Sequence, residues 1–295
     1  MNAASHMPLW KSILLETYYQ ASSPARIRRN AQLAAQGRAP AIVLFYHRIA
    51  DHGPNDWTMT SKNFARQVRW LARNFDVVSL ASACDRLERG YNRRPCVSIT
   101  FDDGYTDNCK FAIPFLLEHN IPFTYFVTTT NILEGIPFAH DVALGRPLEP
   151  NTPAQIRELA NQGVEIGAHT RTHADIGQIL DSERLHDEIV TARDELENLI
   201  EQPVRYFAFP YGQHANMSGA AFELARDSGY EAVCSAYGGY NFPGEDSFHL
   251  QRIHADSGLV RLKNWMTLDW RKLRSTRRFE YEIKQPVHEE LCACE

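Results

Sequence analysis

The chain places two adjacent carboxylates between an apolar run and a glycine, in the stretch Ser98-Ile99-Thr100-Phe101-Asp102-Asp103-Gly104. Successive residues of a strand point to opposite faces, but at a strand end, where the backbone turns, both side chains can reach one cleft. Two uncompensated carboxylates there would repel each other, and one would take up a proton. A divalent cation removes that penalty, because one carboxylate can bind the ion while the other stays free as a base. The alternative is an ordinary Asp-Asp-Gly turn that closes a strand.

A second short apolar run, residues 164–168, leads into two histidines four positions apart, His169 and His173. This spacing puts both imidazoles on one side of a helical turn or a tight loop, where they can bind one ion. With Asp103 they form a set of three ligands. Three protein ligands leave one coordination position open, as a catalytic zinc requires, whereas structural zinc sites are closed and usually contain thiolates. The sequence therefore predicts a catalytic metal site.

The composition of the chain excludes several function classes. Its 295 residues carry a net charge of −5, so no global basic character indicates a nucleic-acid partner. Apolar residues make up 44% and charged residues 23%, as is typical of a globular protein. No apolar run approaches the length of a membrane span, and residues 1–40 lack the apolar core and cleavage site of a secretory signal. We therefore expect a cytoplasmic protein, with peripheral membrane attachment as an alternative.

That alternative arises from the N-terminal segment. Its larger apolar residues recur at the spacing of a helix, at positions Trp10, Ile13, Leu14 and Tyr18. Several arginines follow within the next twenty residues. One interpretation is a helix packed on the domain, which the modest amphipathic character favours. The other is a segment that lies on a membrane surface or a partner, aided by the arginines.

From residue 41 the pattern alternates between short apolar runs and amphipathic segments. We expect strands at 41–46, 96–101, 123–128, 164–168, 206–209, 231–235 and 250–253. We expect helices at about 64–71, 111–118, 153–162, 185–199 and 216–228, with Thr60 or Ser61 and Thr152 as caps. Regular β-α alternation with short connections implies a parallel sheet. The motif carboxylates and histidines fall at the carboxyl ends of strands, which form the catalytic face of α/β barrels.

A third segment completes a set of three motifs: Arg205-Tyr206-Phe207-Ala208-Phe209-Pro210-Tyr211-Gly212. Together with Thr100–Gly104 and His169–His173, in this order, it resembles the motifs of the polysaccharide deacetylases, the carbohydrate esterases built on the NodB homology domain. The resemblance covers about residues 40–260 and implies an irregular (β/α)7 barrel. On this basis we expect an N-terminal helical extension (1–40), a NodB-like catalytic domain (41–260) and a C-terminal extension (261–295).

The resemblance also implies an activity. It predicts a hydrolase that removes N-acetyl groups from an N-acetylated sugar polymer or glycan precursor, as in exopolysaccharide synthesis. Asp103, His169 and His173 would bind the metal, expected to be Zn²⁺ with Co²⁺ or Ni²⁺ as alternatives. Asp102 would be the base that takes a proton from the attacking water.

Four more residues complete the predicted catalytic set. Arg205 would hold Asp102 ionised and oriented by a charge-assisted hydrogen bond, and the backbone amide of Tyr211 would donate to the oxyanion. The alternatives are a surface charge and a residue that merely follows a strand-end proline. His47 lies in a Tyr-His-x-Ile element like that of the envelope poly-N-acetylglucosamine deacetylases, and it is the expected general acid. His254 competes for that role, because other relatives carry a histidine in a late motif.

The chain departs from the family pattern after the Pro-Tyr-Gly element. The family's aspartate-tryptophan motif is not apparent there, and Asp269-Trp270 comes late enough to lie outside the barrel. Two alternatives to N-deacetylation stay open. One is a deformylase or O-deacetylase that uses the same site. The other is an inactive barrel that binds glycan or anchors an export complex, although a binding module has no need of a base beside a metal.

Overall fold

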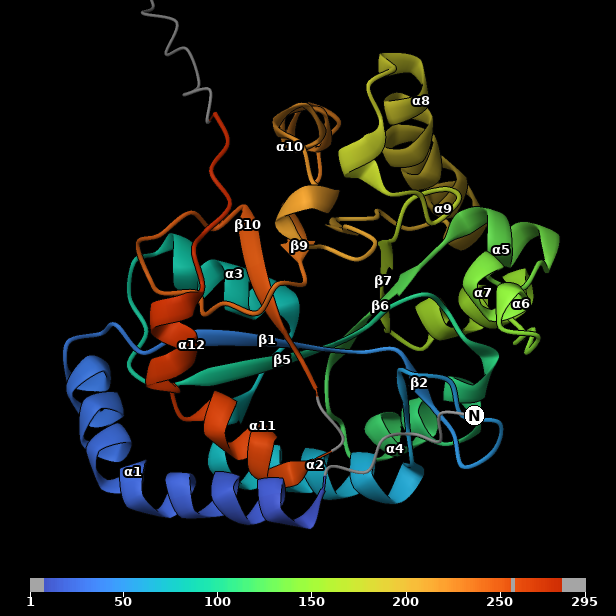
Figure 1. Ribbon diagram of the computed structural model, residues 1–295. Coiled ribbons are helices and arrows are strands. Elements are labelled where there is room, and N and C mark those ends of the chain that lie inside the picture. Colours follow the sequence, from blue (N-terminus) through green and yellow to red (C-terminus); the bar gives the residue numbers. More distant parts are fainter. Residues whose placement is uncertain (1–7, 256–257, 283–295) are drawn as a thin grey trace, which may run out of the picture.

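Seven parallel strands form a closed barrel in the computed structural model, which describes residues 8–255 and 258–282 (Figure 1). The strands are β1 (Ala41–Tyr46), β5 (Cys96–Phe101), β6 (Phe123–Val127), β7 (Glu165–Ala168), β8 (Tyr206–Ala208), β9 (Ala232–Ser235) and β10 (His249–His254). They follow the order β1-β10-β9-β8-β7-β6-β5, and the pairing of β1 with β5 closes the ring. The predicted irregular (β/α)7 barrel is therefore confirmed.

Two short pairings extend this ring. β4 (Asp76–Val77) pairs with the beginning of β5, and β2 (Arg48–Ile49) pairs with β3 (Thr58–Met59) beyond the carboxyl end of β1. The second pairing matters for function, because it shapes the loop that follows β1 at the mouth of the barrel.

Apolar side chains from around the ring fill the barrel interior. One buried cluster takes residues from five different strands, which can meet only inside the ring: Val43, Phe126, Ala208, Cys234 and Leu250. The alternate residues of the strands point outward and form a larger cluster with the surrounding helices. Every strand residue of β1 and β5 is buried as a result, which explains why these strands read as continuous apolar runs.

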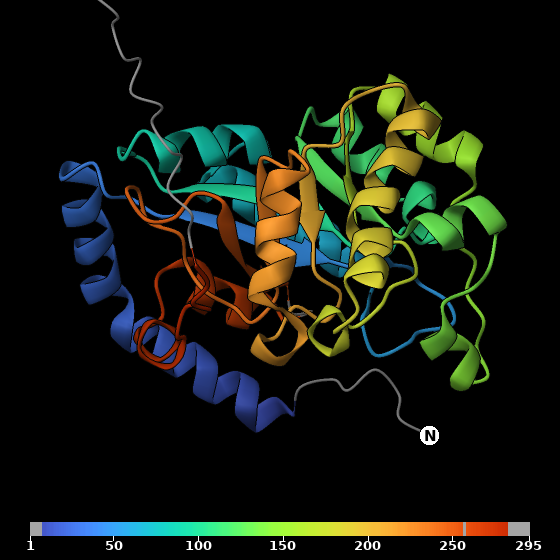
Figure 2. The same ribbon diagram turned by 90° about the horizontal axis from the view of Figure 1, so that it is seen from above.

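Helices cover the outside of the barrel in both views (Figures 1 and 2). They include α2 (Ser61–Asn74), α4 (Ala112–Glu118), α5 (Thr129–Glu134), α6 (Ala139–Ala143), α7 (Pro153–Asn161), α8 (Ser182–His186), α9 (Ala192–Ile200) and α10 (Gly219–Asp227). α3 (Leu80–Glu88) instead packs against the interior cluster through Leu80, Ala83 and Leu87. Two predicted caps are confirmed: the Thr60 side chain accepts from the backbone of Asn63, and Thr152 forms a capping box with Gln155. The helix predicted over 185–199 contains a π-helical turn, Asp187–Thr191, between α8 and α9.

Three further helices pack together on one flank of the barrel. They are α1 (Leu9–Ala35), α11 (Leu259–Met266) and α12 (Trp270–Ser275). The buried Arg26 of α1 donates to the carbonyl and side-chain oxygens of Asn264 in α11, at 2.8 and 2.9 Å. Tyr18 donates to Asp269, the cap of α12, at 3.0 Å. Among the described residues, no helix has the length and apolarity needed to cross a membrane.

The contact between β5 and α2 gives a test of this packing. Phe101→Ala should lower the free energy of unfolding by about 3–5 kcal/mol, because the buried Phe101 ring lies against Tyr46 and Phe64 and would leave a cavity. Urea denaturation followed by circular dichroism measures the change. Leu180→Ala is the control, since Leu180 is 99% exposed and its loss should change stability by less than about 0.5 kcal/mol. Equal losses in the two variants would contradict the packing described.

Candidate active site

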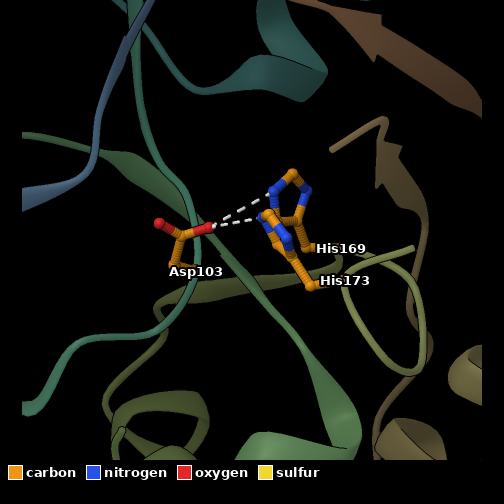
Figure 3. Close-up of side chains that lie close together, drawn as sticks. All are labelled: Asp103, His169 and His173. Atoms are coloured by element: carbon orange, nitrogen blue, oxygen red, sulfur yellow. Dashed lines mark ion pairs between the residues drawn. The ribbon is translucent and has the colours of Figure 1, made fainter. Parts of the chain in front are cut away.

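Three side chains from two distant segments converge at the carboxyl ends of β5 and β7 (Figure 3). One ligand atom from each of Asp103, His169 and His173 lies within 4.8 Å of the other two. Asp103 Oδ1 is 3.5 Å from His169 Nε2 and 3.2 Å from His173 Nε2. Asp103 and His169 are buried, whereas His173 is partly open to solvent. The structure thus brings together the three residues predicted as metal ligands.

The donor set at this point fits a divalent cation. Asp103 Oδ1 is buried and has no hydrogen bond within the described part of the chain, although it faces two imidazole nitrogens. His169 Nδ1 lies 2.7 Å from the carbonyl oxygen of Ala208, which places the proton on Nδ1 and leaves Nε2 as an electron-pair donor. Burial raises the pKa of Asp103, but His169 and His173 lower it well below its usual range. An ionised carboxylate and imidazole nitrogens are typical ligands of zinc.

A backbone turn after β5 directs both carboxylates to this mouth. The N–H of Asp102 still donates to the carbonyl of Tyr46, at 2.9 Å, as in a continuing strand. Asp103 and Gly104 then adopt positive φ angles of 76° and 98°, a region that favours glycine. A Cβ on Gly104 would lie 3.1 Å from the side chain of Val127. The turn explains why two consecutive residues serve one site instead of opposite faces.

A buried glutamate anchors the loop that carries the two histidines. Glu188, in the π-helical turn, accepts from the N–H groups of Arg171 and Thr172 at 3.0 and 2.9 Å, and from the Thr172 hydroxyl. Thr170 and His173 have positive φ angles of 62° and 59°, a conformation that needs support from the surroundings. Sequence reasoning missed Glu188. Its signal is a carboxylate on the buried side of a predicted helix.

Asp102 forms a bidentate ion pair with Arg252 of β10. Arg252 Nη1 and Nη2 donate to the two carboxylate oxygens at 2.6 and 2.8 Å. The same guanidinium donates to the carbonyl of Ser235 at 3.0 Å and to the hydroxyl of Thr100 at 3.1 Å. These partners come from β5 and β9, so the guanidinium lies inside the barrel, directly below the mouth.

The surroundings of this pair keep Asp102 ionised. Arg252 has no exposed surface, and its Cζ lies 4.8 Å from the ring centroid of Phe45 and 5.3 Å from that of Phe126. Burial raises the pKa of Asp102, but the positive charge of Arg252, with a smaller effect of His169, brings this pKa below its ordinary value. Asp102 is therefore a carboxylate at neutral pH and can accept a proton.

The prediction that Arg205 holds Asp102 is wrong. Arg205 instead forms ion pairs with Glu165 and Glu231. It immediately precedes β8, and Glu165 begins β7, so these charges lie at the amino end of the barrel, opposite the mouth. Arg252 occupies the place beside Asp102 that was predicted for Arg205, and its signal in the sequence is an arginine in the middle of a predicted strand.

The two histidines considered as general acids lie side by side. His47 follows β1, and His254 ends β10 opposite Phe45; the imidazole centroids are 5.8 Å apart. His47 Nδ1 is buried without a hydrogen-bond partner among the described residues, whereas His254 is exposed. Burial lowers the pKa of His47, and the nearby charges of Asp103 and Asp102 act in the opposite direction. His47 therefore lies within electrostatic reach of both carboxylates.

Tyr211 lies next to His173, one of the three predicted metal ligands. Its ring packs edge-on against His173, with centroids 5.3 Å apart, and is 54% exposed. Tyr211 and Gly212 both have positive φ angles, 59° and 55°. A Cβ on Gly212 would lie 2.5 Å from the backbone nitrogen of Ala236, so only glycine fits. This turn holds Tyr211 at the rim of the site.

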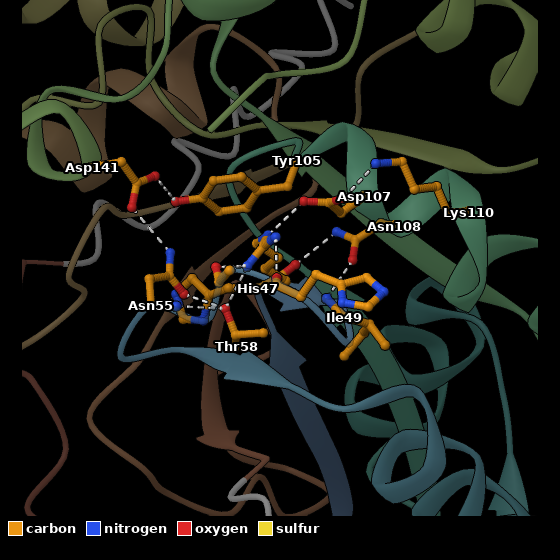
Figure 4. A network of polar contacts seen from close by, with 12 residues as sticks. His47, Ile49, Asn55, Thr58, Tyr105, Asp107, Asn108, Lys110 and Asp141 are labelled. Atoms are coloured by element: carbon orange, nitrogen blue, oxygen red, sulfur yellow. Dashed lines mark hydrogen bonds and ion pairs between the residues drawn. The ribbon is translucent and has the colours of Figure 1, made fainter. Parts of the chain in front are cut away.

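A polar network fixes the loops on the His47 side of the mouth (Figure 4). Asn108 donates to the carbonyl of His47 at 2.7 Å and accepts from the N–H of Ile49 at 2.8 Å. The buried Arg48 forms an ion pair with Asp107 at 2.6 Å. The segment after β1 is therefore clamped to the segment after β5, which restricts the position of His47.

The side chains of Trp57 and His140 connect the same network to the predicted metal ligands. The Tyr105 hydroxyl donates to the buried Asp141 at 2.7 Å, lies 3.0 Å from His140 Nε2 and accepts from Trp57 Nε1 at 3.3 Å. The rings of Trp57 and His140 are 5.0 Å apart, and those of His140 and His173 are 5.5 Å apart. Trp57 and His140 thus form an aromatic wall beside the metal ligands. Sequence reasoning did not single out His140.

Comparison with known proteins agrees with this geometry. Residues 89–233 match the family model described as Polysaccharide deacetylase. YxkH of Bacillus subtilis strain 168, a protein named for the same family, is 24% identical over 234 residues, which cover 78% of this chain and 76% of that protein. A chitooligosaccharide deacetylase of Bradyrhizobium sp. strain ANU 289 is 30% identical over 118 residues, but these cover only 39% of this chain and 46% of that protein.

A solved structure has the same fold. IcaB from Ammonifex degensii superposes with a TM-score of 0.64 at 23% identity, over 78% of this chain and 97% of that chain. The family match includes the Asp-Asp-Gly motif, the two histidines and the Pro-Tyr-Gly motif. Residues 89–233 therefore form a domain that is similar to the polysaccharide deacetylases and carries their three motifs.

Proposed function

We propose that this chain is a metal-dependent N-deacetylase of an N-acetylated glycan. The observation that carries the proposal is that two adjacent carboxylates have different partners. Asp103 faces two imidazole nitrogens, whereas Asp102 is ion-paired with Arg252. A metal ligand and an ionised base therefore lie side by side at one barrel mouth, which is what metal-assisted hydrolysis of an amide requires.

The reaction joins the oxygen of water to the acetyl carbon and breaks the carbon–nitrogen bond, which releases acetate and a free amine. Asp103, His169 and His173 would hold the metal, which when bound supplies Lewis acidity toward water and the acetyl carbonyl. Asp102 accepts a proton from the attacking water. Arg252 keeps the Asp102 carboxylate ionised and oriented before the attack.

Groups around the predicted metal ligands protonate the leaving nitrogen and stabilise the negative charge of the oxyanion. His47 donates a proton to the leaving nitrogen; burial lowers the pKa of His47, and the nearby charges of Asp103 and Asp102 favour its protonated form. His254 is the second candidate for this role, because its ring lies beside that of His47. The backbone N–H of Tyr211 donates to the oxyanion.

Metal and substrate follow from the same chemistry. Two imidazoles and one carboxylate with an open coordination position favour Zn²⁺, with Co²⁺ and Ni²⁺ as substitutes. The curated relative that acts on chito-oligosaccharides supports amino sugars as the substrate class. The aromatic wall of Trp57 and His140 offers a face on which a sugar ring can pack.

Acetate release from a panel of acetylated glycans tests this proposal. The zinc-loaded protein should release acetate from chito-oligomers or acetylated polymers. Asp102→Asn should bind the metal as the wild type does but lose at least about 100-fold in turnover, since it lacks the base. Metal content is measured by elemental analysis, and His169→Ala is the control that should lose the metal. Loss of metal in Asp102→Asn would mean that the two aspartates have exchanged roles. Acyl transfer only from formyl or O-acetyl compounds, or no turnover at all, would refute N-deacetylation.

The assignment of the general acid has its own test. His47→Ala should lower kcat by about 100-fold or more, because proton donation to the amine is lost. His254→Ala should lower it by less than about tenfold, since this imidazole is exposed and lies farther toward solvent. Both variants should retain the metal. Equal losses of kcat in the two variants would refute the choice of His47.

Two arginines provide a matched pair for testing the support of the base. Arg252→Met should lower kcat/KM by about 10- to 100-fold, and it should move the acid limb of the pH profile to higher pH. The limb moves to higher pH because Asp102 would stay buried, which raises its pKa, and would lose the positive charge that lowers this pKa. Arg252→Lys keeps a positive charge and should shift the limb less.

Arg205→Met removes the arginine at the opposite end of the barrel and should change kcat/KM by less than about threefold. Circular dichroism verifies that all variants are folded. An unchanged acid limb in Arg252→Met, or an equal loss in Arg205→Met, would contradict the described role of Arg252.

A further inference from the structure

The free face of α1 carries a concentration of exposed apolar side chains. Five large hydrophobic residues of this helix are more than half exposed: Leu9 (77%), Trp10 (67%), Ile13 (58%), Leu14 (61%) and Ile27 (65%). The first four lie within two successive turns and form one patch, and Ile27 lies farther along the helix, beyond Pro24. Exposed apolar patches of this kind mark interaction surfaces.

The opposite face of α1 is already occupied. Arg26 and Tyr18 contact Asn264 and Asp269 in the α11–α12 region, and Leu33 packs on the core. α1 runs along the outer edge of the molecule in both ribbon views (Figures 1 and 2). The apolar face therefore has no partner among the described residues, and packing onto the barrel does not explain it.

The helical layer around this face is strongly basic. Segments 9–38 and 258–278 together contain twelve lysines and arginines and only two acidic residues, whereas the rest of the chain has 19 basic and 34 acidic residues. Several of these cations are exposed, among them Lys11, Arg28, Arg271 and Arg274. A chain with a net charge of −5 thus concentrates positive charge beside its exposed apolar helix.

We propose that α1 binds the surface of an anionic lipid bilayer, with Leu9, Trp10, Ile13 and Leu14 inserted at the level of the headgroups. An apolar face that includes a tryptophan and is flanked by lysine and arginine is the pattern of helices that lie in the membrane interface. Exposed basic side chains of α1 itself, among them Lys11 and Arg28, would contact the negatively charged headgroups. The attachment does not depend on the enzymatic activity.

Charge also argues against a second copy of this chain as the occupant. A twofold contact through α1 would bring the same patch of both copies together, and with it two basic layers. Like charges opposed at short distance disfavour such a contact, whereas phosphate headgroups would neutralise them. An anionic surface satisfies both the apolar and the basic features, and a symmetric dimer satisfies only the first.

Co-sedimentation of the full chain with lipid vesicles tests the proposal. Binding to phosphatidylcholine vesicles that contain phosphatidylglycerol should exceed binding to phosphatidylcholine alone, and added salt should weaken it. Leu14→Glu should reduce the affinity by about tenfold or more, because an apolar contact is replaced by a charge. Leu180→Glu is the matched control: it makes the same change at a 99% exposed leucine outside α1 and should bind as the wild type does.

A fluorescence readout locates the contact. Adding anionic vesicles should shift the tryptophan emission of the wild type to shorter wavelength, and Trp10→Phe should lose that shift. Deacetylation of a soluble oligomer should be the same in Leu14→Glu and wild type, so failure of attachment is distinguishable from failure of the enzyme. No binding to anionic vesicles, equal binding of Leu14→Glu and wild type, or a wild-type dimer that Leu14→Glu converts to a monomer would overturn the proposal.

Discussion

The ion pair between Arg252 and Asp102 is the interaction on which the site depends. Both charges are taken out of water inside the barrel, at a cost of several kcal/mol for each ion. The bidentate geometry and the further acceptors, Ser235 and Thr100, offset this cost. An arginine cannot lose its proton at this depth, so Asp102 must stay ionised to balance it. The barrel interior thus holds the Asp102 carboxylate in its ionised form.

The two neighbouring aspartates differ because their surroundings differ. Arg252 cancels the charge of Asp102, whereas Asp103 faces only imidazoles, one of which directs its proton away toward Ala208. The buried site consequently has one negative charge that the protein does not compensate. A divalent ion bound there would change this to one net positive charge. The positive φ of Asp103 makes the division feasible, because it separates two side chains that share one strand end.

Sequence reasoning predicted the fold and the proximity of Asp103, His169 and His173 because both are encoded locally. Each strand is a short apolar run, and the carboxyl ends of parallel strands share one edge, so Asp103, His169 and His173 could be grouped without coordinates. Arg252 could not be found in this way, since its contact with Asp102 joins residues 150 positions apart across the barrel interior. The role of Glu188 was not predicted for a similar reason: its partners are backbone N–H groups, which no side-chain motif reveals.

A comparison of the Arg205–Glu165 and Arg252–Asp102 pairs shows why residue type alone does not assign a role. Arg205 and Glu165 pair at the amino end, where their side chains are 36% and 21% exposed, and water and ions screen such a pair. Arg252 and Asp102 pair at the mouth, where the corresponding values are 0% and 3%. The same chemical contact is a minor surface feature in the first case and controls a protonation state in the second. Depth in the barrel decides the difference, and it follows from the position of each residue along its strand: Arg205 precedes β8, whereas Arg252 lies within β10 at a point where its side chain turns inward below the mouth.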